Sequence, residues 1–394
     1  MSERRTSILG ALLATLGPIS MAIYTPAMPE LVTAFTTSDS VIKMTLSVYF
    51  GGFSIAQLLS GPMSDAFGRR SATLFFVGVY VLGSLMAAFA PGVEWLLAGR
   101  LIQGVGASVG ITVARAIVRD QFTGTEASRI MNLIGIMLAI GPATAPTLGG
   151  LSLAAFGWQS IFFLLIGFGL LVCLSVFVFM RETTVPDRSR ARPGSLLSAY
   201  AVLATDKKFI ARSLVLGGSI GALYALATML PFILIKIVGL SPTAFGLGML
   251  MQTGAYFFGS IALRYSAPRL GGDRCVEVGL GLIVTAGLMM VLSARVVAPS
   301  YLSIMLPAAF LSSGIAFLMP HLTTTALYPF PKIAGSASAM MGFIQMGSGF
   351  LAGVAAALIG MPLIAFGTII PCMVTIAALS YAYIRHDGRK KGRA

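Results

Sequence analysis

Long apolar stretches dominate this sequence and leave few ways for it to fold. Twelve of them, each near the length of roughly 20 residues that a bilayer-spanning helix needs, alternate with charged or Gly/Pro-rich breaks. Only 10% of the residues are charged, whereas soluble domains carry about 25%. A soluble enzyme is therefore excluded, and we predict an all-α integral membrane protein with 12 transmembrane helices. The predicted spans are 8–28, 42–60, 72–90, 95–115, 130–153, 159–180, 212–235, 243–263, 276–294, 301–325, 334–358 and 362–384.

The positions of the positive charges predict how the helices are oriented. If both termini lie on one side, the segments on that side hold 23 of the 27 Lys and Arg residues. The positive-inside rule makes that side cytoplasmic and predicts a multi-pass protein of the bacterial inner membrane, surrounded by lipid. A net charge of +14 could also suggest a nucleic-acid binder, but binding needs cations clustered on one solvated face. We therefore predict no nucleic-acid partner.

The longest polar stretch lies between the sixth and seventh spans and divides the chain in two. We predict an N-terminal six-helix bundle over 1–180, a C-terminal six-helix bundle over 212–384 and a basic cytoplasmic tail over 385–394. The Arg/Pro/Ser-rich segment 181–211 between the bundles is predicted to be a cytoplasmic linker with a short surface helix over 196–203. We expect a monomer.

The loop between the second and third spans reads GPMSDAFGRR over 61–70. Its glycines allow a tight turn, and its acid and two arginines place both signs of charge at the inner surface, although an ordinary positive loop is the alternative. The spacing G-x-x-x-D-x-x-G-R-R resembles the signature loop of the major facilitator superfamily, which implies a cytoplasmic gate. The implied gate residues are Gly61, Asp65, Gly68, Arg69, Arg70 and, at the inner end of the fourth span, Asp120. In the second half, the stretch from Gly259 has Leu263 where the acid would be.

Arg100 is the one charge well inside a predicted span, about 9 Å beyond Glu94 at 1.5 Å per residue. An arginine there costs at least about 2.5–3.5 kcal/mol on insertion, so it usually faces a cavity or a partner. Snorkelling to the outer surface is the alternative. Gln103 shares its helix face. The run R-x-x-Q-G-x-G resembles a superfamily motif that implies proton coupling in antiporters.

The fifth span contains GPATAPTLGG over 141–150, in which prolines remove backbone hydrogen bonds and glycines permit close helix approach. It resembles the antiporter motif of the superfamily and implies a helix hinge, with a simple kink as the alternative. The hinge residues are Gly141, Pro142, Pro146, Gly149 and Gly150.

Longer stretches narrow the resemblance to the bicyclomycin and chloramphenicol/florfenicol resistance branch: RAIVRDQFTG over 115–124, FGWQSIF over 157–163 and the run over 319–346. Members typically carry an acid two residues before the tyrosine of the first helix, but this chain has Ala22 before Tyr24. No acid falls in the centre of a span. His321 then becomes a proton-coupling candidate beside Arg100, because histidine titrates in the useful pH range. The alternative for His321 is a hydrogen-bonding role without coupling.

Polar and aromatic residues that share helix faces predict the solute pocket. An aromatic, acid-free cavity with one arginine suits planar amphipathic solutes that are neutral or anionic, although each residue alone could simply pack. The substrate-binding candidates are Tyr24, Tyr49, Phe53, Gln57, Arg100, Gln103, Asn132, Tyr224, Gln252, Tyr256, His321, Met341 and Gln345.

These observations predict a secondary active transporter with the major facilitator fold that works by alternating access. The leading hypothesis is multidrug efflux coupled to protons. The lost helix-1 acid leaves open an importer of a nutrient such as a riboflavin-like vitamin or a siderophore, and a non-transporting membrane sensor is a third possibility. We predict no enzyme activity, no cofactor and no metal site, because the sequence has no catalytic constellation, nucleotide-binding loop or paired cysteine motif.

Overall fold

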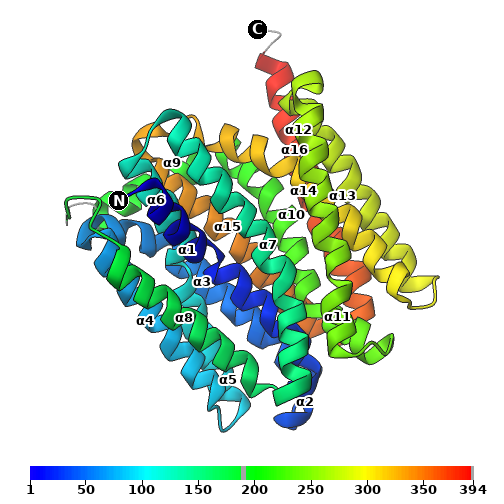
Figure 1. The fold of residues 1–394 in the computed structure, drawn as a ribbon. Coiled ribbons are helices and arrows are strands. Elements are labelled where there is room, and N and C mark those ends of the chain that lie inside the picture. Colours follow the sequence, from blue (N-terminus) through cyan, green and yellow to red (C-terminus); the bar gives the residue numbers. More distant parts are fainter. Residues whose placement is uncertain (188–191, 392–394) are drawn as a thin grey trace. The chain divides into compact units, whose positions relative to one another are not determined.

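A computed structural model describes residues 1–187 and 192–391, except for the side chains of residues 139 and 387–391, and these residues are overwhelmingly helical (Figure 1). Parts of the predicted linker (188–191) and tail (392–394) lie outside the described residues. The chain divides into two compact units. The first comprises 1–199 with 242–246, and the second comprises 200–241 with 247–394.

In the first unit, helix α1 packs on α6 and α7, α5 packs between α3 and α4, and α8 packs on α4. Serine caps begin two of the helices: the side chain of Ser2 accepts from Arg5 N, and that of Ser38 accepts from Val41 N. The helices are α1 (Glu3–Tyr24), α2 (Met28–Ala34), α3 (Asp39–Phe67), α4 (Arg69–Ala88), α5 (Val93–Ala107), α6 (Val109–Gln121), α7 (Gly124–Phe156) and α8 (Gln159–Phe179).

The second unit repeats this packing pattern. Helix α10 packs on α15 as α1 does on α7, α14 packs between α12 and α13 as α5 does between α3 and α4, and α16 packs on α13 as α8 does on α4. The repetition of one six-helix arrangement is typical of transporters built from structural repeats. The helices are α10 (Lys207–Pro231), α12 (Leu250–Leu270), α13 (Gly272–Arg295), α14 (Tyr301–Leu327), α15 (Ala334–Ile359) and α16 (Pro362–Lys391), while α9 (Pro193–Thr205) and α11 (Pro242–Gly248) cross the division between the units.

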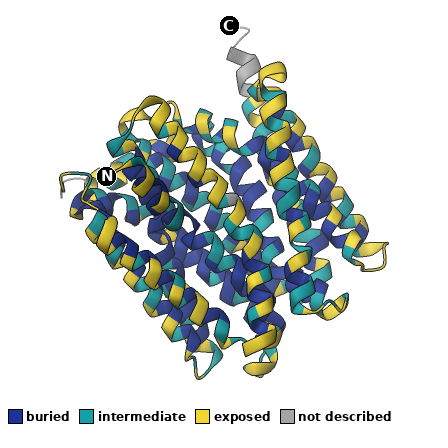
Figure 2. Ribbon diagram, viewed as in Figure 1, coloured by how far each residue is buried: buried dark blue, intermediate teal, exposed yellow. Residues whose placement is uncertain are grey.

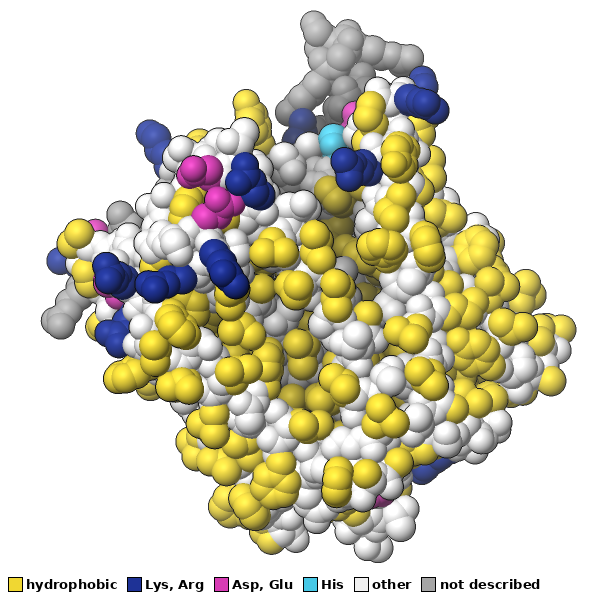
Figure 3. All heavy atoms as spheres, viewed as in Figure 1, with side chains coloured by type: hydrophobic (Ala, Val, Ile, Leu, Met, Phe, Trp, Pro, Cys, Tyr) yellow, Lys and Arg dark blue, Asp and Glu magenta, His cyan; other side chains and the backbone are white. Residues whose placement is uncertain are grey.

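Eleven helical segments in the described part of the chain are long and apolar enough to cross a membrane. Helix α12 is long enough but is not among these eleven, and it carries Arg264 and Arg269. The helices turn buried faces inward and exposed, largely hydrophobic faces outward (Figures 2 and 3). On the face shown, charged side chains gather mainly toward one end of each unit (Figure 3). The prediction of an all-α membrane fold of two six-helix bundles is confirmed.

Several membrane segments are interrupted. The first predicted span breaks after Tyr24 into a 3-10 turn (Thr25–Ala27) before α2. The fourth consists of α5 and α6 on either side of Ser108, and the eighth of α11 and α12 on either side of Met249. The seventh ends in a turn of π-helix over Phe232–Ile237. Interruptions of this kind often mark functional segments of transporters.

Candidate functional site

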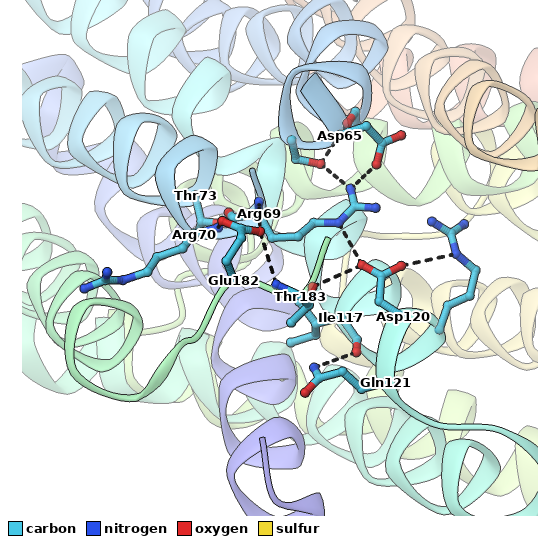
Figure 4. Close-up of polar contacts among 12 residues, drawn as sticks. Asp65, Arg69, Arg70, Thr73, Ile117, Asp120, Gln121, Glu182 and Thr183 are labelled. Atoms are coloured by element: carbon cyan, nitrogen blue, oxygen red, sulfur yellow. Dashed lines mark hydrogen bonds and ion pairs between the residues drawn. The ribbon is translucent and has the colours of Figure 1, made fainter. Parts of the chain in front are cut away.

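Arg69 is the centre of a charged cluster at one end of the first unit (Figure 4). Its guanidinium forms an ion pair with Asp65 one turn earlier and with Asp120 at the end of α6, where Nε lies 3.0 Å from Oδ2. Nη1 also donates to Ser64 Oγ at 2.6 Å. Arg69 is only 2% exposed and Asp120 15% exposed, so these contacts are shielded from water and stronger than typical surface pairs. The arginine therefore ties the end of α3 to the end of α6.

The turn that places Arg69 depends on Gly68. This glycine lies between α3 and α4 with φ +95°, a conformation that residues with a side chain rarely adopt. Gly61, by contrast, lies inside α3, which continues to Phe67. The expectation that Gly61 forms part of the turn is wrong, because the residues after it remain helical and Ser64 Oγ donates back to the Gly61 carbonyl at 2.7 Å.

Glu182, which sequence reasoning missed, caps the N-terminus of α4. Its Oε1 accepts from the backbone N–H of Arg69 at 2.6 Å, and its Oε2 accepts from that of Arg70 at 3.2 Å. A carboxylate there satisfies donors that have no helical partner and faces the positive end of the helix dipole. Because the cap lies 113 residues along the chain from Arg69, no local sequence pattern could indicate it.

Residues around Glu182 fasten the same segment to the cluster. Thr183 Oγ1 donates to Asp120 Oδ2 at 3.1 Å, and the N–H of Asp187 donates to the Asp65 carbonyl at 3.1 Å. Arg70 points the other way: it donates to the Phe177 carbonyl at 2.8 Å and packs over the ring of that residue. Residues 181–187 therefore form a strap across the loop between α3 and α4.

We expect Glu182→Gln to lower stability more than Glu126→Gln, which removes the same charge from the first turn of α7 but breaks no hydrogen bond given for the described residues. Both variants lose a charge near a helix N-terminus, but only in Glu182→Gln does an amide with one acceptor oxygen replace a carboxylate that binds two N–H groups. The free energy of unfolding should fall by about 0.5–2 kcal/mol, the range measured for N-cap replacements. Thermal unfolding of the purified variants in detergent measures the difference. Equal melting temperatures for the two variants would contradict the capping role.

Arg100 lies deep in the first unit, on α5, and is completely buried. Its Nη1 donates to the Gln103 side-chain oxygen, and Gln103 Nε2 in turn donates to Ser84 Oγ at 2.7 Å. The guanidinium carbon lies 4.2 Å from the centre of the Tyr24 ring and 4.5 Å from that of Tyr49. Within the part of the chain that the structure describes, Arg100 forms no ion pair, and its Nε and Nη2 have no hydrogen-bond partner. The alternative that Arg100 snorkels to the surface is wrong, because its side chain is enclosed by neutral groups.

The glycines around Arg100 explain how it becomes enclosed. A Cβ on Gly104 would collide with the backbone carbonyl of Tyr49, so only glycine lets α3 approach α5 this closely. Gly83 and Gly99 place α4 equally close, since a Cβ on Gly99 would lie 2.9 Å from the Gly83 carbonyl oxygen. The glycines of the R-x-x-Q-G-x-G run therefore bring a neighbouring helix and its tyrosine over the arginine.

The predicted hinge helix, α7, runs without interruption through Pro142 and Pro146. Its glycines permit close packing: a Cβ on Gly141 would lie 3.1 Å from the side chain of Ile19, and one on Gly149 would collide with the Ile23 carbonyl, both on α1. Gly150 likewise approaches the backbone of 242–243 within the first unit. The structure thus accounts for the glycines of the GPATAPTLGG run as packing positions.

The structure gathers only some of the pocket candidates of the first unit. Tyr24, Tyr49, Arg100 and Gln103 form one buried group, and Phe53 lies against Tyr49, with their ring centres 6.3 Å apart. The other two candidates do not belong to this group. Gln57 is buried one turn beyond Phe53 on α3, and Asn132 is exposed on α7.

In the second unit, the candidates lie on four helices. Tyr224 is on α10, Gln252 and Tyr256 are on α12, His321 is on α14, and Met341 and Gln345 are on α15. Gln252 and Met341 are buried, and the Tyr256 hydroxyl donates to the sulfur of Met319 at 3.8 Å.

His321 pairs with an exposed acid at the start of a neighbouring helix. Its Nε2 lies 3.1 Å from Oδ1 of Asp273, which is 90% exposed in the first turn of α13. The helix turn of this unit is at Gly271 (φ +80°), as it is at Gly68 in the first unit. Aligning the two turns places Arg264, and not Gly259, at the position of Gly61. The prediction that the stretch from Gly259 corresponds to the loop is therefore wrong, and the acid of this half, Asp273, follows the turn by two residues.

Comparison with known proteins places the chain in a family. The sequence profile of the Major Facilitator Superfamily matches residues 10–357. An uncharacterised MFS-type transporter of Bacillus subtilis, YdgK, is 30% identical over 351 residues, which cover 86% of this chain and 85% of the relative. Multidrug resistance protein D of Escherichia coli is 28% identical over 348 residues, covering 88% and 87%.

A solved structure, that of a D-xylose-proton symporter, superposes with a TM-score of 0.74 at 16% identity, covering 95% of this chain and 96% of that one. This similarity concerns the fold. Transporters of this kind are not enzymes, and they move small organic solutes across membranes. With its repeated six-helix units, its charged loop at Gly68 and a family match over most of its length, this chain belongs to the Major Facilitator Superfamily.

Proposed function

We propose that this protein exports a small amphipathic organic solute, drugs included, by alternating access coupled to a proton gradient. The observation that carries the proposal is the buried Arg100, held among tyrosine rings and neutral side chains on a membrane helix. A charge is costly at that depth and is retained there for function. The aromatic, acid-free surroundings suit a planar neutral or anionic solute better than a lipophilic cation.

Sequence similarity supports the direction of transport. A protein named for multidrug resistance is related to this chain over most of both lengths. The stretches over 115–124, 157–163 and 319–346 resemble the bicyclomycin and chloramphenicol/florfenicol resistance branch. We further propose a monomer in the bacterial inner membrane with both termini cytoplasmic, in line with the bias of positive charge.

Inside-out membrane vesicles test this function. With the protein present, an imposed proton gradient should drive accumulation of a fluorescent amphipathic drug, and an uncoupler should collapse it. Vesicles from the same cells without the protein provide the control. A gradient-independent signal, or one equal to that of the control, would reject proton-coupled export.

Import of a nutrient is the second candidate function, and one observation favours it. The position of the usual helix-1 acid holds Ala22, which is buried, so a carboxylate for proton exchange is missing there. If whole cells that contain the protein take up a riboflavin-like vitamin or a siderophore while their drug susceptibility is unchanged, the function is import and not export. Purified protein that binds solutes but passes none in liposomes would instead indicate a sensor.

We propose His321 as a proton-responsive residue and expect His321→Asn to flatten the pH dependence of transport. Asparagine keeps a hydrogen-bonding side chain near Asp273 but cannot gain charge as pH falls. Initial rates of drug accumulation between pH 5.5 and 8, a range that spans the usual titration of histidine, measure the effect. His386, which is exposed on α16, offers a matched His→Asn control. A profile that moves equally in both variants, or in neither, assigns His321 a structural role.

A further inference from the structure

The guanidinium of Arg100 has one edge without a hydrogen-bond partner among the described residues. Its Nη1 is used by Gln103, and the two nitrogens without a partner in the described residues are Nε and Nη2. These two nitrogens lie side by side on one edge of the planar guanidinium, and that edge binds both oxygens of a carboxylate at once. The two unpartnered donors can therefore bind both oxygens of one carboxylate.

Among the residues that the structure describes, no acidic side chain pairs with this edge. The hydroxyl of Tyr24 pairs with Thr45 Oγ1 at 2.6 Å, and that of Tyr49 donates to the Gly17 carbonyl at 3.0 Å. Both tyrosines present their ring faces to the guanidinium. A buried charge without a counter-ion is strongly destabilising, so the site favours any ligand that brings a negative charge.

The helix that covers the arginine changes its hydrogen-bonding pattern at the covering residue. Tyr24, which covers it, is the last residue of α1, and the chain changes there to the 3-10 turn Thr25–Ala27. An interrupted membrane helix is where transporters commonly bind their solutes.

We propose that the solute carries a carboxylate or a similar planar oxyanion, which binds Nε and Nη2 of Arg100 while its apolar body packs on the tyrosine rings. This inference rests on the proposed function and names the class of its solute. The solute then supplies the negative charge that the chain itself lacks at Ala22. Transport of an acid in its charged form therefore needs no carboxylate in the first helix.

A pair of probes that differ only in charge tests the site. We expect 1-naphthoate to stabilise the purified protein and 1-naphthamide to do so only at concentrations about ten- to a hundredfold higher, the effect of a charged hydrogen-bonded pair. Acetate at equal concentration separates a solute-borne carboxylate from a site for any small anion. Equal affinities for naphthoate and naphthamide, or for naphthoate and acetate, would overturn the proposal.

Gln103→Glu is the decisive variant, because it places a carboxylate on Arg100 with almost no change in shape. The preference for naphthoate over naphthamide should disappear in it and persist in Gln159→Glu, the same change at an exposed position of α8. Arg100→Lys, which keeps the charge but loses the flat edge, should reduce the preference as well. A naphthoate preference unchanged in Gln103→Glu and Arg100→Lys would reject the site.

The outcome separates this inference from the proposed function. Arg100-dependent export of a neutral drug, with no preference for naphthoate, would reject the anion site alone. Selective naphthoate binding by a protein that transports nothing in vesicles or liposomes would reject the transport function alone.

Discussion

Replacement of Arg100 by alanine is expected to abolish solute flux while the protein remains in the membrane in normal amount. The variant removes the only charged side chain in the group formed with Tyr24, Tyr49 and Gln103, and with it the interaction that would hold a solute. Membrane insertion should not suffer, because removing an arginine from the centre of a membrane helix makes insertion more favourable by about 2.5–3.5 kcal/mol. Accumulation in vesicles, normalised to protein quantified by blotting, measures the loss.

The folded state of this variant needs its own measurement. Alanine leaves a cavity beneath two tyrosine rings, and cavities destabilise proteins. Arg100→Gln fills more of that space and retains a hydrogen-bonding partner for Gln103, so it should fold well and still fail to transport. Normal flux in either variant would remove Arg100 from the solute site.

The second large effect is expected at Arg69. Arg69→Ala should strongly reduce transport, because it removes the cation that pairs with both Asp65 and Asp120. An unpaired, poorly hydrated carboxylate costs about 1–3 kcal/mol or more. The cost changes the balance between the conformations that transport requires. Initial transport rates in vesicles and the melting temperature of the purified protein measure the two consequences separately.

Arg70→Ala is the matched control for this prediction. The two arginines are adjacent, but Arg70 reaches the Phe177 carbonyl and ring and does not take part in the pairs with Asp65 and Asp120. We expect transport by Arg70→Ala to remain within a few-fold of the unmodified protein, since exposed contacts contribute little. Equal losses in the two variants would show that the loop needs only positive charge.

The sequence predicted the features that follow from composition and local spacing. Apolar runs indicated the membrane-spanning segments. These segments are helical because every backbone N–H and C=O group in a bilayer needs a hydrogen-bond partner within its own segment. The depth of Arg100 along its span indicated burial. Sequence reasoning did not find Glu182, because its cap on α4 joins residues that are distant in the chain. The loop of the second half was placed at Gly259 because the turn at Gly271 lacks an acid three residues before its glycine, the spacing that Asp65 and Gly68 show in the first half.

The pairing of His321 with Asp273 was also beyond sequence reasoning. An apolar run predicts that a histidine lies in a helix. It does not predict which residue of a neighbouring helix lies beside that histidine. Helix α13 starts one residue before Asp273, and that register brings its first turn to His321. Relations of this kind depend on helix packing, which no single stretch of residues specifies.

The cap on α4 also has a consequence for the order of synthesis. The N-terminus of α4 is made when the ribosome has reached residue 69, but the carboxylate that satisfies its N–H groups arrives 113 residues later. Until α8 has entered the membrane, the loop between α3 and α4 lacks both its cap and the strap of residues 181–187. A nascent chain that stops before Glu182 therefore leaves this loop unfinished.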